Sequence, residues 1–180
     1  MNYCSKCPLN LYKVNSSPYN EGVGDPWKGR CIVVPTIDTK GWTFDRQIET
    51  IGEVLNLSTG ELLQTLFVVP LIRCNEHLKC MIDSNAINKC RMWLNEDIAK
   101  YEFKDILLLG SAVNNILNCP IGSNLNYVCL HGKQRYFVNY SPYIKDRDAE
   151  KYEIFKANMI RWYNSTMSGM YDNYDIFVLS

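Results

Sequence analysis

The sequence predicts an α/β protein: a three-layer α/β/α sandwich around a mainly parallel, four-stranded central sheet. Three observations lead to this fold class. Hydrophobic residues make up 47% of the 180 residues and charged residues 21%, which is enough apolar material for the core of one domain. Short apolar runs alternate along the chain with segments of helical period, as in repeated βα units. Right-handed crossovers would then place helices on both faces of the sheet.

The first half of the chain supplies two of the strands. "RCIVVP" (30–35) is a short apolar run that stops at a proline, which predicts a buried strand. Residues 43–57 space their apolar side chains at intervals of three and four, which predicts a helix with Thr43 as its N-cap. "STGE" (58–61) has the pattern of a capping box and starts a short helical turn. "LFVVPLI" (66–72) is the second predicted strand.

The second half repeats the alternation. Residues 83–101 carry apolar side chains along one side of a predicted helix. "DILLLG" (105–110) predicts the third strand, and "SAVNNIL" (111–117) a helix that starts at a serine. "RYFVNY" (135–140) is the fourth strand, followed by a long helix over 147–164. In a parallel sheet of this kind, functional groups are expected just after the carboxyl ends of the strands.

Composition indicates the cellular compartment in which the protein is expected to work. The start "MNYCSKC" lacks a basic region followed by an apolar one, so we expect no secretory signal. No apolar run approaches the roughly 20 residues of a membrane helix, which favours a soluble, cytoplasmic protein. In that compartment the eight cysteines are expected to be thiols or metal ligands rather than disulfides. The 19 basic and 19 acidic residues cancel, so any nucleic-acid contact requires a local basic face.

Cysteine spacing is the strongest chemical motif. Cys4 and Cys7 form a C-x2-C pair near the start, Cys74 ends the second predicted strand, and Cys90 lies sixteen positions later in the next helix. Four thiolates from this set can hold zinc or an iron–sulfur cluster, and spacing alone leaves both open, as it does a chain without metal. Cys80 is a further candidate ligand. The remaining cysteines are expected to be core or near-surface thiols: Cys31, Cys119 and Cys129.

This cysteine arrangement resembles that of the family 4 and family 5 uracil-DNA glycosylases, which carry a four-iron cluster on four cysteines. Similarity continues, in order, through four stretches: "EGVGDPWKGRCIVVP", "LFVVPLIRC", "DILLLGSAVNNIL" and "HGKQRYFVNYSPYIKDRDAEK". The resemblance implies a glycosylase-like fold and a [4Fe–4S] cluster, with zinc as the alternative. The implied ligands are Cys4, Cys7, Cys74 and Cys90.

Three positions depart from the family's catalytic pattern. The family's acidic residue after the first strand falls on Thr36, with Asp38 close behind as a possible substitute. The asparagine that reads uracil falls on Pro70, which has no side-chain donor and no backbone N–H. The histidine that steadies the departing base falls on Ser141. The resemblance therefore implies a catalytically degenerate glycosylase-like protein that serves as a DNA-binding replication or repair accessory; the alternative is an active DNA glycosylase with rearranged residues.

Candidate nucleic-acid contacts also follow from the resemblance. An aromatic side chain near the first strand would stack on a base, unless it simply begins the apolar face of its helix. Basic side chains around the closing strand and helix would hold phosphates near the pocket, unless they are ordinary solvated charges. The candidates are Phe44, His131, Lys133, Arg135, Lys145 and Arg147.

The resemblance also sets the expected domain boundaries. It covers residues 1–163, which we expect to form the glycosylase-like domain. Residues 164–180 are then a polar linker and an apolar tail, "YDIFVLS". This tail is expected to add an edge strand or to bind a partner protein; the alternative is that it packs on its own domain.

Overall fold

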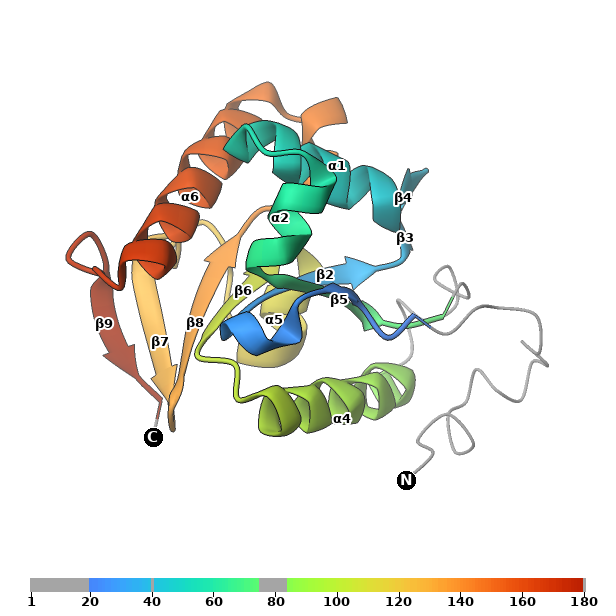
Figure 1. Cartoon of the computed structure of the whole chain (residues 1–180), viewed down its shortest axis with the longest axis vertical. Coiled ribbons are helices and arrows are strands. Elements are labelled where there is room, and N and C mark those ends of the chain that lie inside the picture. Colours follow the sequence, from blue (N-terminus) through green and yellow to red (C-terminus); the bar gives the residue numbers. More distant parts are fainter. Residues whose placement is uncertain (1–19, 40, 75–83, 180) are drawn as a thin grey trace.

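A computed structural model describes residues 20–39, 41–74 and 84–179, with main-chain description only at 38 and 39. Within these ranges the main sheet has seven strands, in the order β1-β5-β2-β6-β8-β7-β9 (Figure 1). The strands are β1 (Val23–Gly24), β2 (Arg30–Thr36), β5 (Phe67–Ile72), β6 (Asp105–Leu109), β7 (Tyr127–His131), β8 (Gln134–Asn139) and β9 (Asp175–Val178). A separate hairpin follows β2 and consists of β3 (Asp38–Thr39) and β4 (Trp42–Thr43).

The four predicted strands form the parallel centre of this sheet. Val33 of β2 pairs with Val69 of β5 on one side and with Leu108 of β6 on the other, and β6 pairs in parallel with β8. β1 and β7 are antiparallel to their neighbours, and β9 is parallel to β7. The mixed α/β class is confirmed, but the expected number of four strands is wrong. β1 has only two residues, β7 is partly buried and β9 is exposed, unlike the fully buried central strands.

Helices cover both faces of the sheet, which explains why the central strands are apolar on both sides (Figure 1). Ile32 and Leu107 pack on one side, while Val33 and Leu108 pack on the other. The first face is covered by α1 (Phe44–Leu55), α2 (Thr59–Thr65) and α6 (Ala149–Ser168), and the second by α4 (Ser84–Tyr101) and α5 (Ser111–Leu117). No helix in the described ranges combines the length and the apolar character that crossing a membrane requires.

Both predicted helix starts in the first half are present. The Thr43 hydroxyl accepts a hydrogen bond from the Arg46 N–H at 3.2 Å and caps α1. Ser58 and Glu61 form the expected capping box at α2, with the Glu61 carboxylate accepting from the Ser58 N–H at 2.8 Å. These caps satisfy donors that the first helical turn leaves without intrahelical partners.

The segment after residue 163 continues the domain and does not separate from it. α6 extends to Ser168, and the buried ring of Tyr174 packs edge-on against Phe137, with ring centroids 5.0 Å apart. β9 then pairs with β7 at the edge of the sheet (Figure 1). The expected linker at 164–173 is therefore mostly helix and packed turn. The polar composition suggested a linker, but the buried Ser165 of α6, the half-buried Tyr171 and the buried Tyr174 hold the segment against the domain.

Candidate functional site

The carboxyl ends of β2, β5, β6 and β8 share one edge of the sheet because these strands are parallel. Val34 pairs with Pro70, and Leu109 pairs with Asn139, so the segments that follow these residues emerge at the same edge. Thr36 ends β2, and Ser141 follows β8 by two residues. The three positions that the resemblance assigns to catalysis therefore lie along this carboxyl edge, as a parallel sheet requires.

Ser141 is buried at this edge, with 3% of the residue exposed. Its Oγ has no hydrogen-bond partner within the described residues. Gly110, which precedes α5, lies against it: a Cβ built on Gly110 would be 2.9 Å from the Ser141 Cβ. A hydroxyl in this position can donate or accept one hydrogen bond, but it carries no charge with which to stabilise a departing anion.

A buried glutamine supports the end of β2. Gln47 donates from its Nε2 to the carbonyl of Thr36 at 3.1 Å and to the carbonyl of Trp42 at 3.2 Å. It thereby joins β2 and β4 to α1. Sequence reasoning missed Gln47, although a signal was present: it lies one residue before Ile48 on the apolar side of the helix, where a polar side chain needs a buried partner.

Pro70 is accommodated because of where it lies in β5. β1 pairs only with Phe67 and Val68, so beyond them β5 has β2 as its single strand neighbour among the described residues. Proline is tolerated in a strand where one side lacks a ladder partner. Pro70 therefore fits the strand but supplies neither a polar side chain nor an N–H to the edge.

Phe44 lies in the core. It starts α1, is buried, and packs in the same cluster as Ile48 and Ile51. This is the arrangement expected if Phe44 begins the apolar face of the helix. Asp38 starts β3, two residues after the end of β2 in the sequence, so its main chain follows the carboxyl edge directly.

The predicted basic residues fall at two opposite ends of the sheet. Lys145 lies in the 3-10 helix η4 (Pro142–Asp146) after β8, and Arg147 follows it, at the carboxyl edge. His131 ends β7, Lys133 lies in the turn between β7 and β8, and Arg135 lies near the start of β8. The sequence grouped these residues because they are close along the chain, but a strand separates them in space. They do not form one phosphate-binding group.

The cations at the carboxyl edge are largely engaged. Lys145 Nζ lies 3.7 Å from the Glu53 carboxylate, and the Arg147 guanidinium lies 5.3 Å from the centre of the Tyr143 ring. Both side chains are exposed, so these contacts are weak and can be exchanged for contacts with a ligand.

Cys74 and Cys90 are brought together by the fold. Cys74 follows β5 and Cys90 lies in α4, and both belong to one small apolar cluster with Ile72, Ala86 and Ile87. A buried ion pair between Arg73 and Asp97 ties the end of β5 to α4 beside this cluster. Within the described residues there is no group of three or more histidine, cysteine or acidic side chains. Cys4, Cys7 and Cys80 lie outside these residues.

The N-terminal part of the chain joins the fold close to Cys74. The N–H of Asn20 donates to the carbonyl of Arg73 at 2.9 Å, and Arg73 is the neighbour of Cys74. Cys7 precedes Asn20 by thirteen residues. Thirteen residues span at most roughly 45 Å when extended, so chain length does not prevent Cys7 from reaching the two described cysteines.

The other described cysteines lie in a different cluster from Cys74 and Cys90. Burial raises the pKa of Cys31, Cys119 and Cys129, and for Cys129 the neighbouring Cys119 adds to the effect. Metals bind thiolates, and a raised pKa disfavours that form. These cysteines contact the core on the side of α4 and α5, as expected for small apolar residues.

A scan against protein-family models finds no match to this sequence, and a search of curated proteins finds none either. The glycosylase resemblance therefore rests on the order of its motifs and on the cysteine spacing.

Proposed function

We propose that this chain is a glycosylase-like iron–sulfur protein with substituted catalytic positions, and that it acts as a DNA-binding accessory in replication or repair. One observation carries the proposal. Cys74 and Cys90, chosen as ligands from the sequence, lie in the same cluster although a strand end and half a helix separate them along the chain. Cys4 and Cys7 are proposed to complete the site.

The cluster is proposed to have a structural role. Four thiolates satisfy a [4Fe–4S] cluster, and the ligands would join the N-terminal segment to β5 and α4. Such a link closes a long stretch of chain and restricts the unfolded state. Zinc, which also accepts four thiolates, is the alternative metal.

The carboxyl edge supports a loss of glycosylase activity. Cleavage of a glycosidic bond builds positive charge on the sugar and negative charge on the base, and preorganised groups that face these charges supply much of the catalysis. The three corresponding positions hold Thr36, Pro70 and Ser141, none of which carries a charge. Asp38 is the one carboxylate near the end of β2 in the chain, which keeps an active glycosylase as the second candidate.

DNA binding is proposed to use the exposed cations at the carboxyl edge. Lys145 and Arg147 are exposed, and their partners there are a surface carboxylate and a ring. Phosphate oxygens would replace these weak partners. Because this contact is electrostatic, the affinity for DNA should fall steeply with salt.

The metal is tested on protein purified without oxygen. Absorption near 400 nm with about four iron and four sulfide per chain is the expected result. Cys74→Ala and Cys90→Ala should lower the iron content sharply, whereas Cys129→Ala, which alters a cysteine outside the proposed set, should retain it. Colourless protein with one zinc per chain, or full iron in the Cys90→Ala variant, would contradict the iron–sulfur proposal.

Activity and binding are tested on the same preparation. Uracil-containing oligonucleotides should remain intact after treatment that cleaves abasic sites, while a gel shift at low salt detects DNA binding. Release of uracil that disappears in Asp38→Asn would establish the enzyme instead. Lack of any gel shift would remove the DNA-binding part of the proposal.

A further inference from the structure

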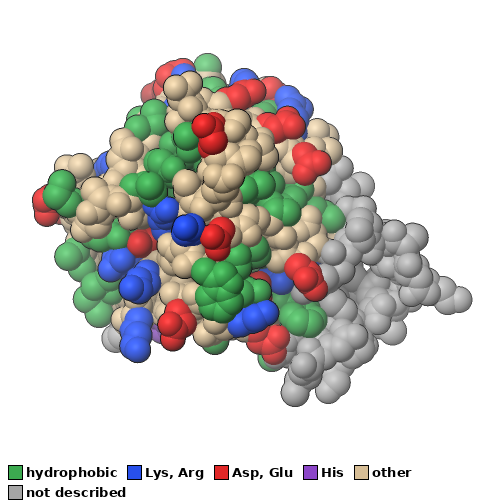
Figure 2. Space-filling model, in the orientation of Figure 1, with side chains coloured by type: hydrophobic (Ala, Val, Ile, Leu, Met, Phe, Trp, Pro, Cys, Tyr) green, Lys and Arg blue, Asp and Glu red, His purple; other side chains and the backbone are tan. Residues whose placement is uncertain are grey.

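A second charged site lies at the opposite, amino edge of the sheet. There, the starts of β2, β6 and β8 and the end of α6 line a cavity of about 390 Å³ that is open to solvent. Figure 2 shows Lys and Arg side chains gathered at the lower left of this face, over the amino ends of β6 and β8. The charged and hydroxyl groups that line this amino-edge cavity are Lys28, Arg30, Lys104, Asp105, Arg135, Thr166 and Tyr171.

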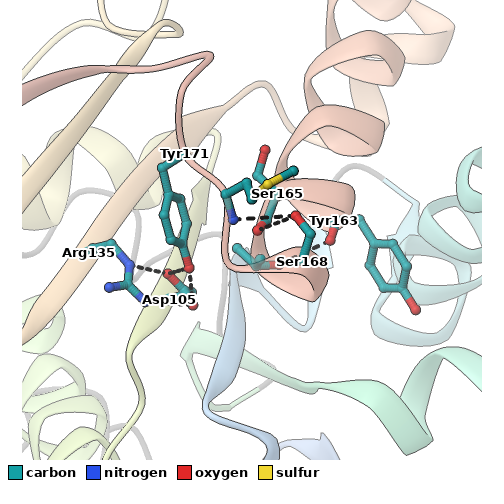
Figure 3. Close-up of polar contacts among 8 residues, drawn as sticks. Asp105, Arg135, Tyr163, Ser165, Ser168 and Tyr171 are labelled. Atoms are coloured by element: carbon teal, nitrogen blue, oxygen red, sulfur yellow. Dashed lines mark hydrogen bonds and ion pairs between the residues drawn. The ribbon is translucent and has the colours of Figure 1, made fainter.

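The single carboxylate of the cavity is already occupied. Asp105 accepts two hydrogen bonds from Arg135, at 2.6 Å and 3.1 Å, and its two oxygens accept from the Tyr171 hydroxyl at 3.0 Å. Figure 3 shows Arg135 and Tyr171 converging on this carboxylate from different sides. The two bonds from Arg135 use Nε and one terminal nitrogen, so the other terminal nitrogen keeps its donors.

Arg30 adds a positive charge that no carboxylate in the described chain contacts directly. Only 8% of the residue is exposed, and its terminal nitrogens donate to the carbonyl of Thr65 and the sulfur of Met167. Its Nε has no hydrogen-bond partner among the described residues. Burial lowers the pKa of Arg30, as expected for a cation that loses water without a paired anion.

The two lysines of the cavity keep their charges available. Lys104 is exposed and makes no ion pair within the described ranges, while its N–H donates to the carbonyl of Gly29 at 2.8 Å and fixes the backbone there. Lys28 Nζ lies 3.9 Å from Asp25, with half of its side chain exposed. Asp105 and the C-terminal end of α6 offset part of the positive charge. Even with Asp25 beside Lys28 counted, four cations against two carboxylates leave an excess of positive charge.

We propose that the amino-edge cavity binds a phosphate group. Guanidinium and ammonium donors around one cavity match the oxygens of a phosphate, and partial burial strengthens each contact. The phosphate belongs to a small phosphorylated molecule or to a nucleic-acid backbone. The site lies at the other end of the sheet from the proposed DNA contacts and does not depend on the iron–sulfur cluster.

The test uses inorganic pyrophosphate as the probe in calorimetry at low salt on the full chain. Lys104→Ala and Lys28→Ala should each weaken pyrophosphate binding about tenfold, since a hydrogen bond to a charged group is lost. Lys156→Ala is the matched control, because Lys156 pairs with Glu153 on α6 and does not line the cavity, and it should leave the affinity unchanged. The exposed lysines can be removed without opening the core, and unfolding midpoints in urea verify that each variant is folded.

A second measurement identifies the source of the phosphate. A labelled single-stranded oligonucleotide is bound to the protein, and pyrophosphate is then added. Displacement of the oligonucleotide assigns the site to a nucleic-acid backbone, and pyrophosphate binding without displacement assigns it to a small phosphorylated molecule. No pyrophosphate binding at millimolar concentration, or equal weakening in the Lys104 and Lys156 variants, would overturn the proposal. Failure of the iron count or of the gel shift would leave these results interpretable.

Discussion

At opposite ends of the parallel sheet, Asp105 and Asp146 each bind one arginine and one aromatic donor, but they differ in burial. The side chain of Asp105 is 7% exposed, whereas that of Asp146 is 52% exposed. At the amino edge, Arg135 binds Asp105 through two nitrogens and also lies 4.4 Å above the centre of the Tyr171 ring. Arg135, Asp105 and Tyr171 therefore contact one another pairwise where they line the amino-edge cavity (Figure 3).

The equivalent unit at the carboxyl edge is open to water. Asp146 accepts from the Trp42 Nε1 at 2.8 Å and from Arg46 at 3.2 Å, and the Arg46 guanidinium lies 3.8 Å from the centre of the Trp42 ring. Solvent and salt screen an exposed ion pair, so its net contribution is small. The two ion pairs, although built from the same kinds of group, therefore contribute differently to the free energy of unfolding, because Asp105 is buried and Asp146 is exposed.

The two ends also differ in the space that they leave beside a glycine with positive φ. Gly110 at the carboxyl edge has φ +56° and faces Ser141 and Pro35 at close range, whereas Gly29 at the amino edge has φ +74° and open space beside it. Gly110→Ala should lower the free energy of unfolding by about 3 kcal/mol, since it combines a strained backbone with overpacking. Gly29→Ala should cost about 1 kcal/mol, from the backbone alone. Urea unfolding measures both, and equal losses would contradict the close packing at Gly110.

Removing each carboxylate tests the difference in burial directly. Asp105→Ala should lower the free energy of unfolding by about 2 kcal/mol, less than for a fully buried pair because the Arg135 side chain is 31% exposed. Asp146→Ala should cost less than about 1 kcal/mol, as exposed ion pairs do. If the two variants lose the same stability in urea, the proposed role of burial is wrong.

A smaller effect should appear at alkaline pH. Burial, followed by the charge and hydrogen bond of Asp105, raises the pKa of Tyr171 from 10.0 to about 12. The folded state therefore holds the neutral phenol while the unfolded chain loses its proton. This stabilisation is fully present below pH 10 and is lost as the pH rises toward 12. Tyr171→Phe should show a shallower loss of stability over this range than the parent protein. Identical pH profiles, each referred to its own value at about pH 8, would contradict the shift.

The parallel centre of the fold was readable in the sequence. The four apolar runs became β2, β5, β6 and β8, and both N-terminal helix caps formed at the expected residues. These signals are local: a buried parallel strand needs apolar side chains on both faces, and a cap needs its partner within one helical turn. β7 was missed because it is only partly buried and pairs at the margin of the parallel centre, whereas the apolar tail, expected either to add an edge strand or to bind a partner, forms the edge strand β9.

The candidate sites divide in the same way. Cys74 and Cys90 were proposed as ligands from the cysteine spacing together with the resemblance, and the fold places both in one cluster because a strand followed by its packed helix returns close to the strand end. The grouping of Arg135 with Lys145 failed, because sequence distance does not record which end of a strand a residue occupies. Arg30 and Asp105 showed no motif at all, and they share a cavity only because β2 and β6 are paired in register.

By itself, the sequence determined the α/β class, the order of the central elements and the residues proposed to bind a metal. These depend on side-chain period and on neighbours within a few turns. Tertiary structure alone decided that Asp105 is buried while Asp146 is exposed, and that four cations meet at the amino edge. The starts of β2, β6 and β8 lie far apart along the chain, and parallel pairing brings them to one edge.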